Sequence, residues 1–436
     1  MSQQQRLDEY IQQVCRQIRN KEMHASISQE LRGHLEDKIE DYQANGLTME
    51  SAIDKAIADM GDPIQVGKHL HQAHKPRMEW SVIALVAMLI GFGLLVMYSL
   101  SQSQTDAGHL FTNKVVGIVL GLALFIALLF FDYRKLQPYS LYLYLGIVLC
   151  MLLTNLFGTT VNGRSMYLNI GLLLNVYGIC SVLLILSMAG MFAKWNWEKL
   201  TTLFRAALTL LVPFAILFVS HHSFEAILLL AGFLVLVSVS PAPRRTVWKL
   251  FGALLFIISG LVFLTIQRHQ FHRLLSFLDP LADPNGAGFT LLQSLKTLQE
   301  AELWGHGIGA SLSDLPGTEA EFVFAYIVHS FGLVTGAAIL LLGIVLLIRL
   351  LRAVRLVRDR YGVMLMSGLM TLFFIPYFWS ILMTAGFLPI MSVNLPFISY
   401  GNTSFIMQML LIGLVLNVYR RKDIQPIEAS KPPAQT

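Results

Sequence analysis

The side chains best suited to chemistry lie in one polar segment, residues 268–321, which follows seven apolar stretches. A loop of this length outside a membrane suggests a functional surface, since short connections suffice to join helices. Near its end, the carboxylate of Glu321 could act as a general base. Thr318 and Glu321 also have the spacing of a helix capping box, and the helix dipole favours an acid in a first turn. Both roles for Glu321 stay open, and they are compatible.

Further candidate residues lie elsewhere in the chain. Arg164 could contact a phosphate, because a guanidinium offers paired donors, or it could anchor the chain at lipid headgroups. His221, His222 and Glu225 suggest a zinc site, but neighbouring positions do not share a helix face, and no metal site is expected there. The glycines of residues 304–309 lack the preceding strand and following helix of a nucleotide-binding loop.

The composition indicates a membrane protein that must position these residues on helices. Of 436 residues, 55% are hydrophobic and 14% charged, which is too apolar for a soluble globular protein. Windows long enough to cross a bilayer predict an all-α fold with ten transmembrane helices. They lie near residues 80–100, 114–131, 137–157, 171–193, 203–219, 223–240, 248–266, 321–348, 362–387 and 403–419.

The basic residues predict the orientation of these spans. The net charge of +5 comes from Lys and Arg in short loops between spans, which is a topology signal and no indication of nucleic-acid binding. Positive-inside bias places both termini of this multi-pass protein in the cytoplasm and the loop 267–320 outside. The polar start of the chain excludes a cleavable signal peptide, and the three cysteines form no CxxC pair.

Residues 1–75 are predicted to form a separate cytoplasmic helical domain. A capping box at Ser26 and Gln29 precedes one amphipathic helix, which Asn45-Gly46 would end, and a second helix would end at Gly61. We expect this domain to act as a folding unit or to dock a cytoplasmic partner. The membrane domain would then cover residues 80–422, followed by a disordered tail at 423–436.

A helix break precedes the last span. Pro389, Pro396 and Gly401 interrupt helical structure at membrane depth, which lipid permits only where the backbone is buried or lines a cavity. The segment FISYGN at 397–402 is therefore expected to shape a groove.

Four motifs together resemble the SEDS family of FtsW, RodA and SpoVE type proteins. They are DPNGAGFTLLQS at 283–294, LPGTEAEFVFAYIVHSFG at 315–332, MTAGFLP at 383–389 and FISYGN at 397–402. The resemblance implies that lipid II is polymerised into peptidoglycan glycan strands for cell division or cell shape. Glu321 stands where the family has its favoured catalytic Asp. Substrate contacts are then expected at Arg164, Asp283, Gly286, Gly288, Gln293, Ser294, Glu319, His329, Ser399, Tyr400 and Gly401.

The same resemblance implies further components. A divalent cation, Mg²⁺ or Mn²⁺, could assist the leaving pyrophosphate, and a class B penicillin-binding protein would crosslink the product. Some family motifs are absent: residues 176–179 replace a QPSE box, and residues 220–225 replace a PDLGT box. These departures, with the exchange of Asp for Glu, leave two alternatives open: a non-catalytic scaffold or regulator of cell-wall synthesis, and a flippase for lipid-linked precursors.

Overall fold

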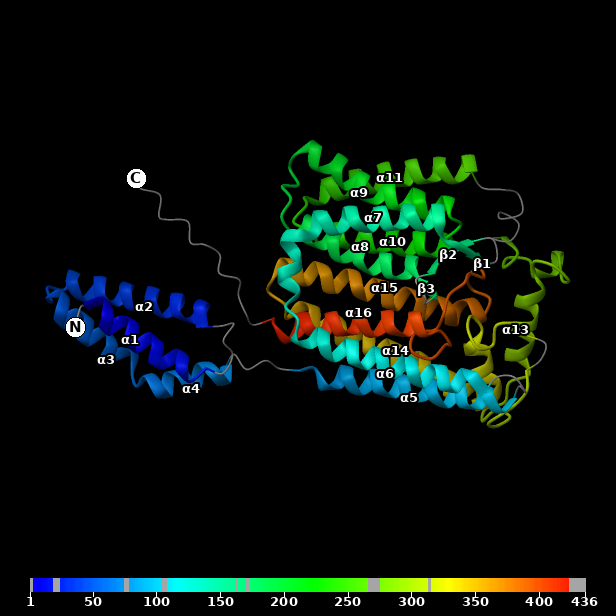
Figure 1. Cartoon of the computed structure of the whole chain (residues 1–436), viewed down its shortest axis with the longest axis horizontal. Coiled ribbons are helices and arrows are strands. Elements are labelled where there is room, and N and C mark those ends of the chain that lie inside the picture. The colour runs from blue at the N-terminus through cyan, green and yellow to red at the C-terminus, as the bar shows by residue number, and fades with distance from the viewer. Residues whose placement is uncertain are drawn as a thin grey trace. The chain divides into compact units, whose positions relative to one another are not determined.

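The computed structural model describes residues 3–18, 24–73, 78–103, 108–161, 164–169, 173–265, 275–312 and 315–422. The chain forms two compact units, one centred on the N-terminal helices and one spanning Glu79–Tyr419; Figure 1 shows the elements of each.

The N-terminal unit contains four described helices that share one apolar core. Val14, Leu35 and Ala52 are fully buried in it. The predicted apolar face of the first amphipathic helix is confirmed, because Leu31 and Ile39 are buried beside Leu35. The helices are α1 (Gln3–Arg16), α2 (His24–Ala44), α3 (Met49–Met60) and α4 (Pro63–Ala73).

Helix ends in this unit follow glycine more closely than the predicted capping box. Gly46 and Gly61 have φ angles of 85° and 84°, a region that glycine adopts readily, and they confirm the two predicted helix ends. The predicted capping box was wrong, because α2 begins at His24 and Ser26 lies inside its first turn. Among the helices of this unit, α3 has a side-chain N-cap, Thr48.

The second unit is a bundle of apolar helices that run side by side (Figure 1). Within the described residues, seven helical stretches are long and apolar enough to cross a membrane. They correspond to α5 (Trp80–Ser103), α6 (Gly108–Phe130), α7 (Ser140–Phe157) with the preceding η2 (Tyr133–Tyr139), α9 (Leu200–Val219), α14 (Val323–Arg355), α15 (Arg360–Thr384) and α16 (Asn402–Arg420). Shorter apolar helices are α8 (Val176–Phe192) and α10 (Ser223–Val239), and α11 (Arg244–Thr265) adds another helix. Each of the ten predicted windows overlaps one of these helices.

Burial separates the centre of the bundle from its periphery. About two thirds of the apolar window of α16 is buried (67%), and 61% of that of α15, against 17% for α6. The helix α8 is buried over its whole length and packs against α7, α10 and α15. The outward faces of the peripheral helices carry large hydrophobic side chains such as Phe130 and Phe256, as expected where a helix contacts lipid.

A small antiparallel sheet at one end of the bundle departs from the all-helical prediction. Its strands are β1 (Thr159–Val161), β2 (Arg164–Asn169) and β3 (Leu173–Asn175), in that order. Val161 pairs with Arg164, and Asn169 pairs with Leu173. The predicted span at 171–193 therefore starts too early, because residues 173–175 belong to β3 and α8 begins at Val176.

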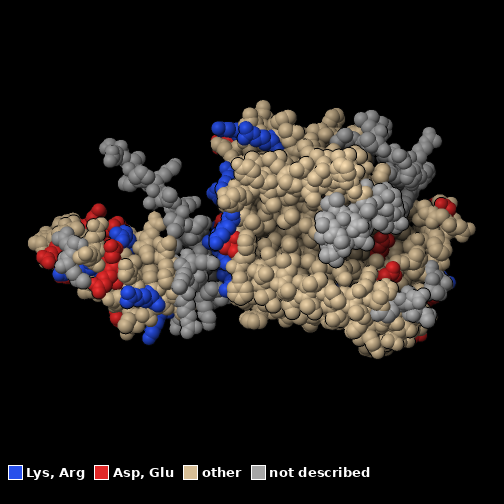
Figure 2. Space-filling view, in the orientation of Figure 1, with Lys and Arg blue, Asp and Glu red and all other residues tan. Residues whose placement is uncertain are grey.

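At the same end, α13 (Phe289–Gln299) runs across the ends of the bundle helices, after a short turn η3 (Pro280–Ala282) (Figure 1). Lys and Arg side chains gather along the opposite end, where α5 begins, while acidic side chains show at the α13 end (Figure 2). The gathering of Lys and Arg at one end is the pattern that the positive-inside rule describes.

Candidate functional site

Glu321 lies in a turn directly before α14. The turn begins at Gly317, whose carbonyl accepts hydrogen bonds from the N–H groups of Ala320 (3.1 Å) and Phe322 (2.9 Å). Gly317 has φ 75°, which favours glycine at that position. We call residues 317–322 the acidic turn, since Glu319 and Glu321 are both in it and both are half-buried.

The capping interpretation of Glu321 was wrong. The helix α14 begins at Val323, its N-cap is Phe322, and no side-chain hydrogen bond caps it. Thr318, which a capping box would place at the N-cap, lies five residues before the helix and is 2% exposed. Within the described residues, the Glu321 carboxylate forms neither a hydrogen bond nor an ion pair. It is therefore available to accept a proton from a bound molecule.

The backbone of the FISYG turn, residues 397–401, holds the acidic turn in place. The Tyr400 N–H donates to the Glu319 carbonyl (2.8 Å), and the Ser399 hydroxyl donates to the Ala320 carbonyl (2.7 Å). Ser399 Oγ also accepts from the Leu395 N–H (2.8 Å). The structure thus brings together two segments that lie about 80 residues apart in the sequence, Ser399 and Ala320 being 79 residues apart.

The FISYG turn also contacts α6. The Asn113 side-chain amide donates to the Tyr400 hydroxyl (2.9 Å), and the rings of His109 and Tyr400 meet edge to face, with 6.2 Å between centroids. Gly401 follows with φ 134° and lets the chain turn into α16. Of the predicted site residues, Glu319, Glu321, Ser399, Tyr400 and Gly401 therefore form one cluster.

The motif at residues 283–294, the loop motif, uses its polar groups internally. The Asp283 carboxylate accepts from the Ala287 N–H (2.9 Å), and its carbonyl accepts from the Gly288 N–H (3.0 Å). Gly286 and Gly288 pack so closely that an added Cβ would lie 2.2 Å from the Asp283 carboxylate and 2.1 Å from the Pro280 carbonyl, respectively. These residues close a compact loop, and their predicted contacts with substrate stay predictions.

Ser294 and Gln293 are on α13, where the loop motif ends. The Ser294 hydroxyl is fully buried and donates to the Thr384 carbonyl (2.9 Å) at the end of α15. Gln293 accepts from the Thr297 hydroxyl through its backbone carbonyl (2.9 Å). Beyond this contact, Met383 of α15 packs against Phe322 of the acidic turn. The loop motif therefore supports the acidic turn through α15, without a described direct contact.

His329 forms part of a break in α14. Its ring stacks on that of His306, with 4.3 Å between centroids, and its carbonyl accepts from the His306 N–H (3.0 Å). Gly332 leaves helical geometry at φ 89°, and the Leu333 N–H turns to the Glu302 carbonyl (3.0 Å). The segment 302–307 thus replaces helical hydrogen bonds that the break removes.

The backbone of Arg164 is in β2, opposite Val161, but its side chain lies outside the described part of the structure. Its predicted phosphate contact stays a prediction. Near α10, His222 is fully buried, and its Nδ1 lies 3.6 Å from a Glu225 carboxylate oxygen. The His222 ring also lies against that of Tyr177, 4.1 Å away.

Among the residues that the structure describes, protein ligands for a metal ion do not cluster near Glu321. Across the described ranges, no group of three or more His, Cys, Asp or Glu side chains is placed to hold an ion. These residues do not fit a site in which the protein supplies the full ligand set for Mg²⁺ or Mn²⁺. The expected cation stays a prediction.

Sequence reasoning missed Lys114. This side chain is 1% exposed, and its Nζ donates to the carbonyls of Ser399 (2.8 Å) and Ile398 (3.4 Å). The signal was present: a lysine within an apolar stretch is costly unless it has partners, and such a residue is a functional candidate by default.

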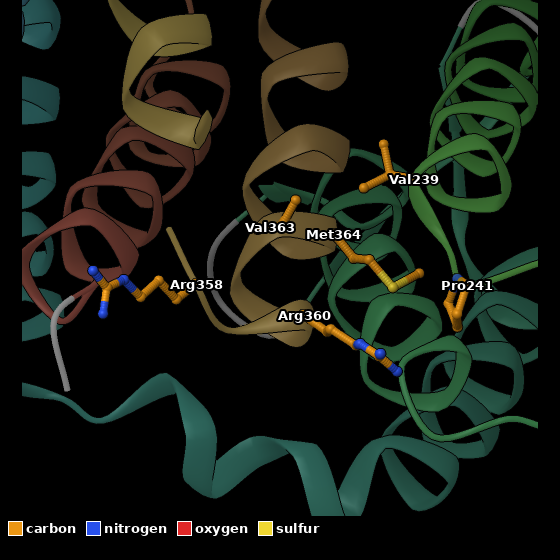
Figure 3. A pocket seen from close by; sticks show the side chains of 6 residues that line it. All are labelled: Val239, Pro241, Arg358, Arg360, Val363 and Met364. Carbon is orange, nitrogen blue, oxygen red and sulfur yellow. The ribbon is translucent and has the colours of Figure 1, made fainter. Parts of the chain in front are cut away.

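A cavity of about 260 Å³ lies at the other end of α15, away from these residues. Figure 3 shows its lining, with the Arg358 and Arg360 side chains pointing away from each other. The lining contains none of the predicted site residues. It consists of Val239, Pro241, Arg358, Arg360, Val363 and Met364.

Comparison with known proteins gives matches across the membrane unit. The sequence model for FtsW, RodA and SpoVE, described as "Cell cycle protein", matches residues 79–424. The "Probable peptidoglycan glycosyltransferase FtsW" of Geobacter metallireducens is 26% identical over 365 residues, with 80% of this chain and 96% of that protein covered. The "Peptidoglycan glycosyltransferase MrdB" of Escherichia coli K12 is 24% identical over 360 residues, with 80% and 95% covered.

Two solved structures share the fold of the membrane unit. One comes from work titled "Structural coordination of polymerization and crosslinking by a peptidoglycan synthase complex". It aligns with a TM-score of 0.68 at 24% identity, covering 80% of this chain and 99% of that chain. The other is the rod shape determining protein RodA of Thermus thermophilus, with a TM-score of 0.60 at 22% identity, covering 80% and 98%. The family match begins at residue 79, where the membrane unit also begins.

Proposed function

Because the chain belongs to the FtsW/RodA/SpoVE family, we propose that it polymerises lipid II into peptidoglycan glycan strands, with Glu321 as the general base. The observation that carries this assignment is the state of the Glu321 carboxylate. It is half-buried at the start of α14, no described residue pairs with it, and its backbone is held by the FISYG turn. A carboxylate with these properties can accept a proton from a substrate hydroxyl.

The reaction joins two lipid-linked sugars. The acceptor hydroxyl oxygen attacks the anomeric carbon of the donor sugar, and its proton passes to the Glu321 carboxylate. The new glycosidic C–O bond forms as the bond from the anomeric carbon to the pyrophosphate oxygen breaks, which inverts the anomeric centre. The lipid pyrophosphate leaves with the bonding electrons. The acidic turn contributes by orienting the base, since reacting groups must be aligned to react efficiently.

The orientation of this multi-pass membrane protein follows from its charge distribution. We propose ten spans with both termini cytoplasmic, because Lys and Arg gather at the end of the bundle opposite α13 (Figure 2). The base then lies at the outer face, with the loop motif. In a protein that lacks Cys15, Cys150 and Cys180, a single cysteine at Asn285 should react with an impermeant thiol reagent applied to cells. A cysteine in place of Thr246 should react only after the cells are lysed. Labelling of that cysteine in intact cells would contradict the proposed orientation.

A partner that crosslinks the strands is part of the proposal. One of the solved structures that share this fold comes from work on a peptidoglycan synthase complex. We therefore expect a class B penicillin-binding protein to bind the membrane unit. For residues 1–75 we propose a cytoplasmic domain that folds around its own apolar core. We propose that this domain docks a separate partner.

A non-catalytic scaffold is the second candidate. It is favoured by α8, which begins at Val176 with apolar, buried residues where the family has its QPSE box. Polymerisation of lipid II by the purified protein, with and without its partner synthase, separates the two functions. We expect glycan strands from wild type and from Glu321→Asp, and polymerisation at least about 10²-fold slower from Glu321→Gln. No product from wild type in the presence of the partner would favour the scaffold, and a fully active Glu321→Gln would exclude Glu321 as the base.

A further inference from the structure

Lys114 is a buried basic side chain inside a bundle that otherwise keeps its Lys and Arg at the surface. Among the described residues of Glu79–Tyr419, it is the one Lys or Arg that is fully buried. It lies six residues into α6, about 9 Å along the helix from its start at 1.5 Å per residue. Removing a basic group from water is costly unless its donors are paired. Its hydrogen-bond partners must therefore offset the free-energy cost of burying the ammonium group.

The partners of Lys114 are all parts of the chain around the FISYG turn. Its Nζ donates to the carbonyls of Ser399 and Ile398, and it lies 4.9 Å from the centroid of the Phe405 ring. The carbonyl dipoles and the face of the ring all attract an ammonium group. Lys114 thus ties α6 to a segment more than 280 residues later, at separations of 284 and 285 residues.

The FISYG turn needs such a tie. Phe397 has φ 65°, an unusual backbone conformation for a bulky residue, and its ring is buried against Phe373 and Phe405. Non-helical backbone inside a membrane protein leaves carbonyls without helical partners, and each needs another donor. Lys114 supplies donors for two consecutive carbonyls of the turn.

The same turn carries the contact on to the acidic turn. Ser399 binds Lys114 through its carbonyl and Ala320 through its hydroxyl. Tyr400, the next residue, donates its N–H to Glu319. A continuous path therefore runs from Lys114 through Ser399 to Ala320, the residue next to Glu321. No described contact joins Lys114 to Glu321 directly.

We propose that Lys114 is a positioning residue for the polymerisation reaction. It fixes the FISYG turn, and that turn fixes the acidic turn so that the Glu321 carboxylate meets the acceptor hydroxyl. This inference rests on the proposed function, in which Glu321 is the base. It assigns to α6 a role in the reaction that depends on geometry and not on contact with substrate.

The test measures kcat and KM for lipid II polymerisation by the full-length protein with its partner synthase. Lys114→Met should lower kcat about 10²-fold with KM close to wild type, because a displacement of about 1 Å can have an effect of this size. Lys114→Arg should recover much of the loss, since a guanidinium can donate to the same carbonyls. Lys135→Met is the matched control: it removes an exposed lysine of η2 and should behave as wild type.

A second variant keeps the test decisive if Lys114→Met does not fold. Ser399→Ala removes the hydroxyl bond to Ala320 and keeps the carbonyl that Lys114 binds. It should also lower kcat with little change in KM. Both substitutions should add no further loss of kcat in a Glu321→Gln protein, because groups on one path do not act independently.

The outcomes separate this inference from the proposed function. Wild-type kcat in Lys114→Met or Ser399→Ala, beside a strongly slowed Glu321→Gln, would overturn the positioning role and leave the base assignment in place. A change confined to KM, or a further loss of kcat in the Glu321→Gln protein, would also overturn it. Full activity of Glu321→Gln would overturn the base assignment, and the positioning role with it.

Discussion

The loop motif and the acidic turn differ in how they use their polar groups. In the loop motif, the side chains of Asp283 and Ser294 accept or donate the hydrogen bonds that close the loop and attach α13 to α15. In the acidic turn, backbone carbonyls accept the hydrogen bonds that hold the segment, and no described residue pairs with the Glu321 carboxylate. The difference teaches that a motif with a clear sequence pattern can serve to hold the fold together. A carboxylate that forms no structural hydrogen bond is the better candidate for chemistry.

Gly288→Ala should have the largest effect on stability in this comparison. An added Cβ would lie 2.1 Å from the Pro280 carbonyl and 3.0 Å from the Asp283 carbonyl, and backbone atoms cannot move aside cheaply. Overpacking of this kind typically costs about 1–3 kcal/mol. A thermal unfolding experiment in detergent should therefore show a lower Tm than wild type.

Gly146→Ala is its control. This glycine is an exposed position on α7, and an added Cβ would meet nothing within 4 Å. Its Tm should match or slightly exceed that of wild type, because alanine favours helix. Equal Tm values for Gly288→Ala and wild type would show that the loop motif is not the rigid scaffold described above.

Asp283→Asn should have the smallest effect. The amide oxygen can still accept from the Ala287 N–H, so the loop keeps its hydrogen bond while the charge is lost. We expect a Tm and a polymerisation rate close to wild type. A large loss of rate at unchanged Tm would mean that the Asp283 charge contacts substrate, and the contrast between the two regions would then fail.

Local sequence patterns predicted much of the fold. The apolar windows located the bundle helices, and Gly46 and Gly61 located two helix ends, because burial and backbone freedom are properties of nearby residues. The strands β1, β2 and β3 were missed because they are short, and because Leu173 and Leu174 of β3 are as apolar as the helix that follows. A short apolar run does not distinguish strand from helix.

The candidate site was predicted less completely, since its geometry depends on distant contacts. Thr318 and Glu321 have the spacing of a capping box, but hydrogen bonds from Ser399 and Tyr400 hold the segment as a turn and delay the helix to Val323. Tertiary contacts commonly override such local preferences. Lys114 was missed for the same reason, because its carbonyl partners lie at the far end of the sequence.

In the proposed reaction, the Glu321 carboxylate accepts the proton of the acceptor hydroxyl. The most direct measurement compares the initial rates of lipid II polymerisation by Glu321→Gln and Glu319→Gln, each with its partner synthase and a Tm as a folding control. The two variants make the same change two residues apart in one turn. General base catalysis is worth about 10² to 10⁴ in rate, so Glu321→Gln should lose at least that lower amount, while Glu319→Gln, which removes a predicted substrate contact but no proton acceptor, should lose less. Equal rates for the two folded variants would contradict the account.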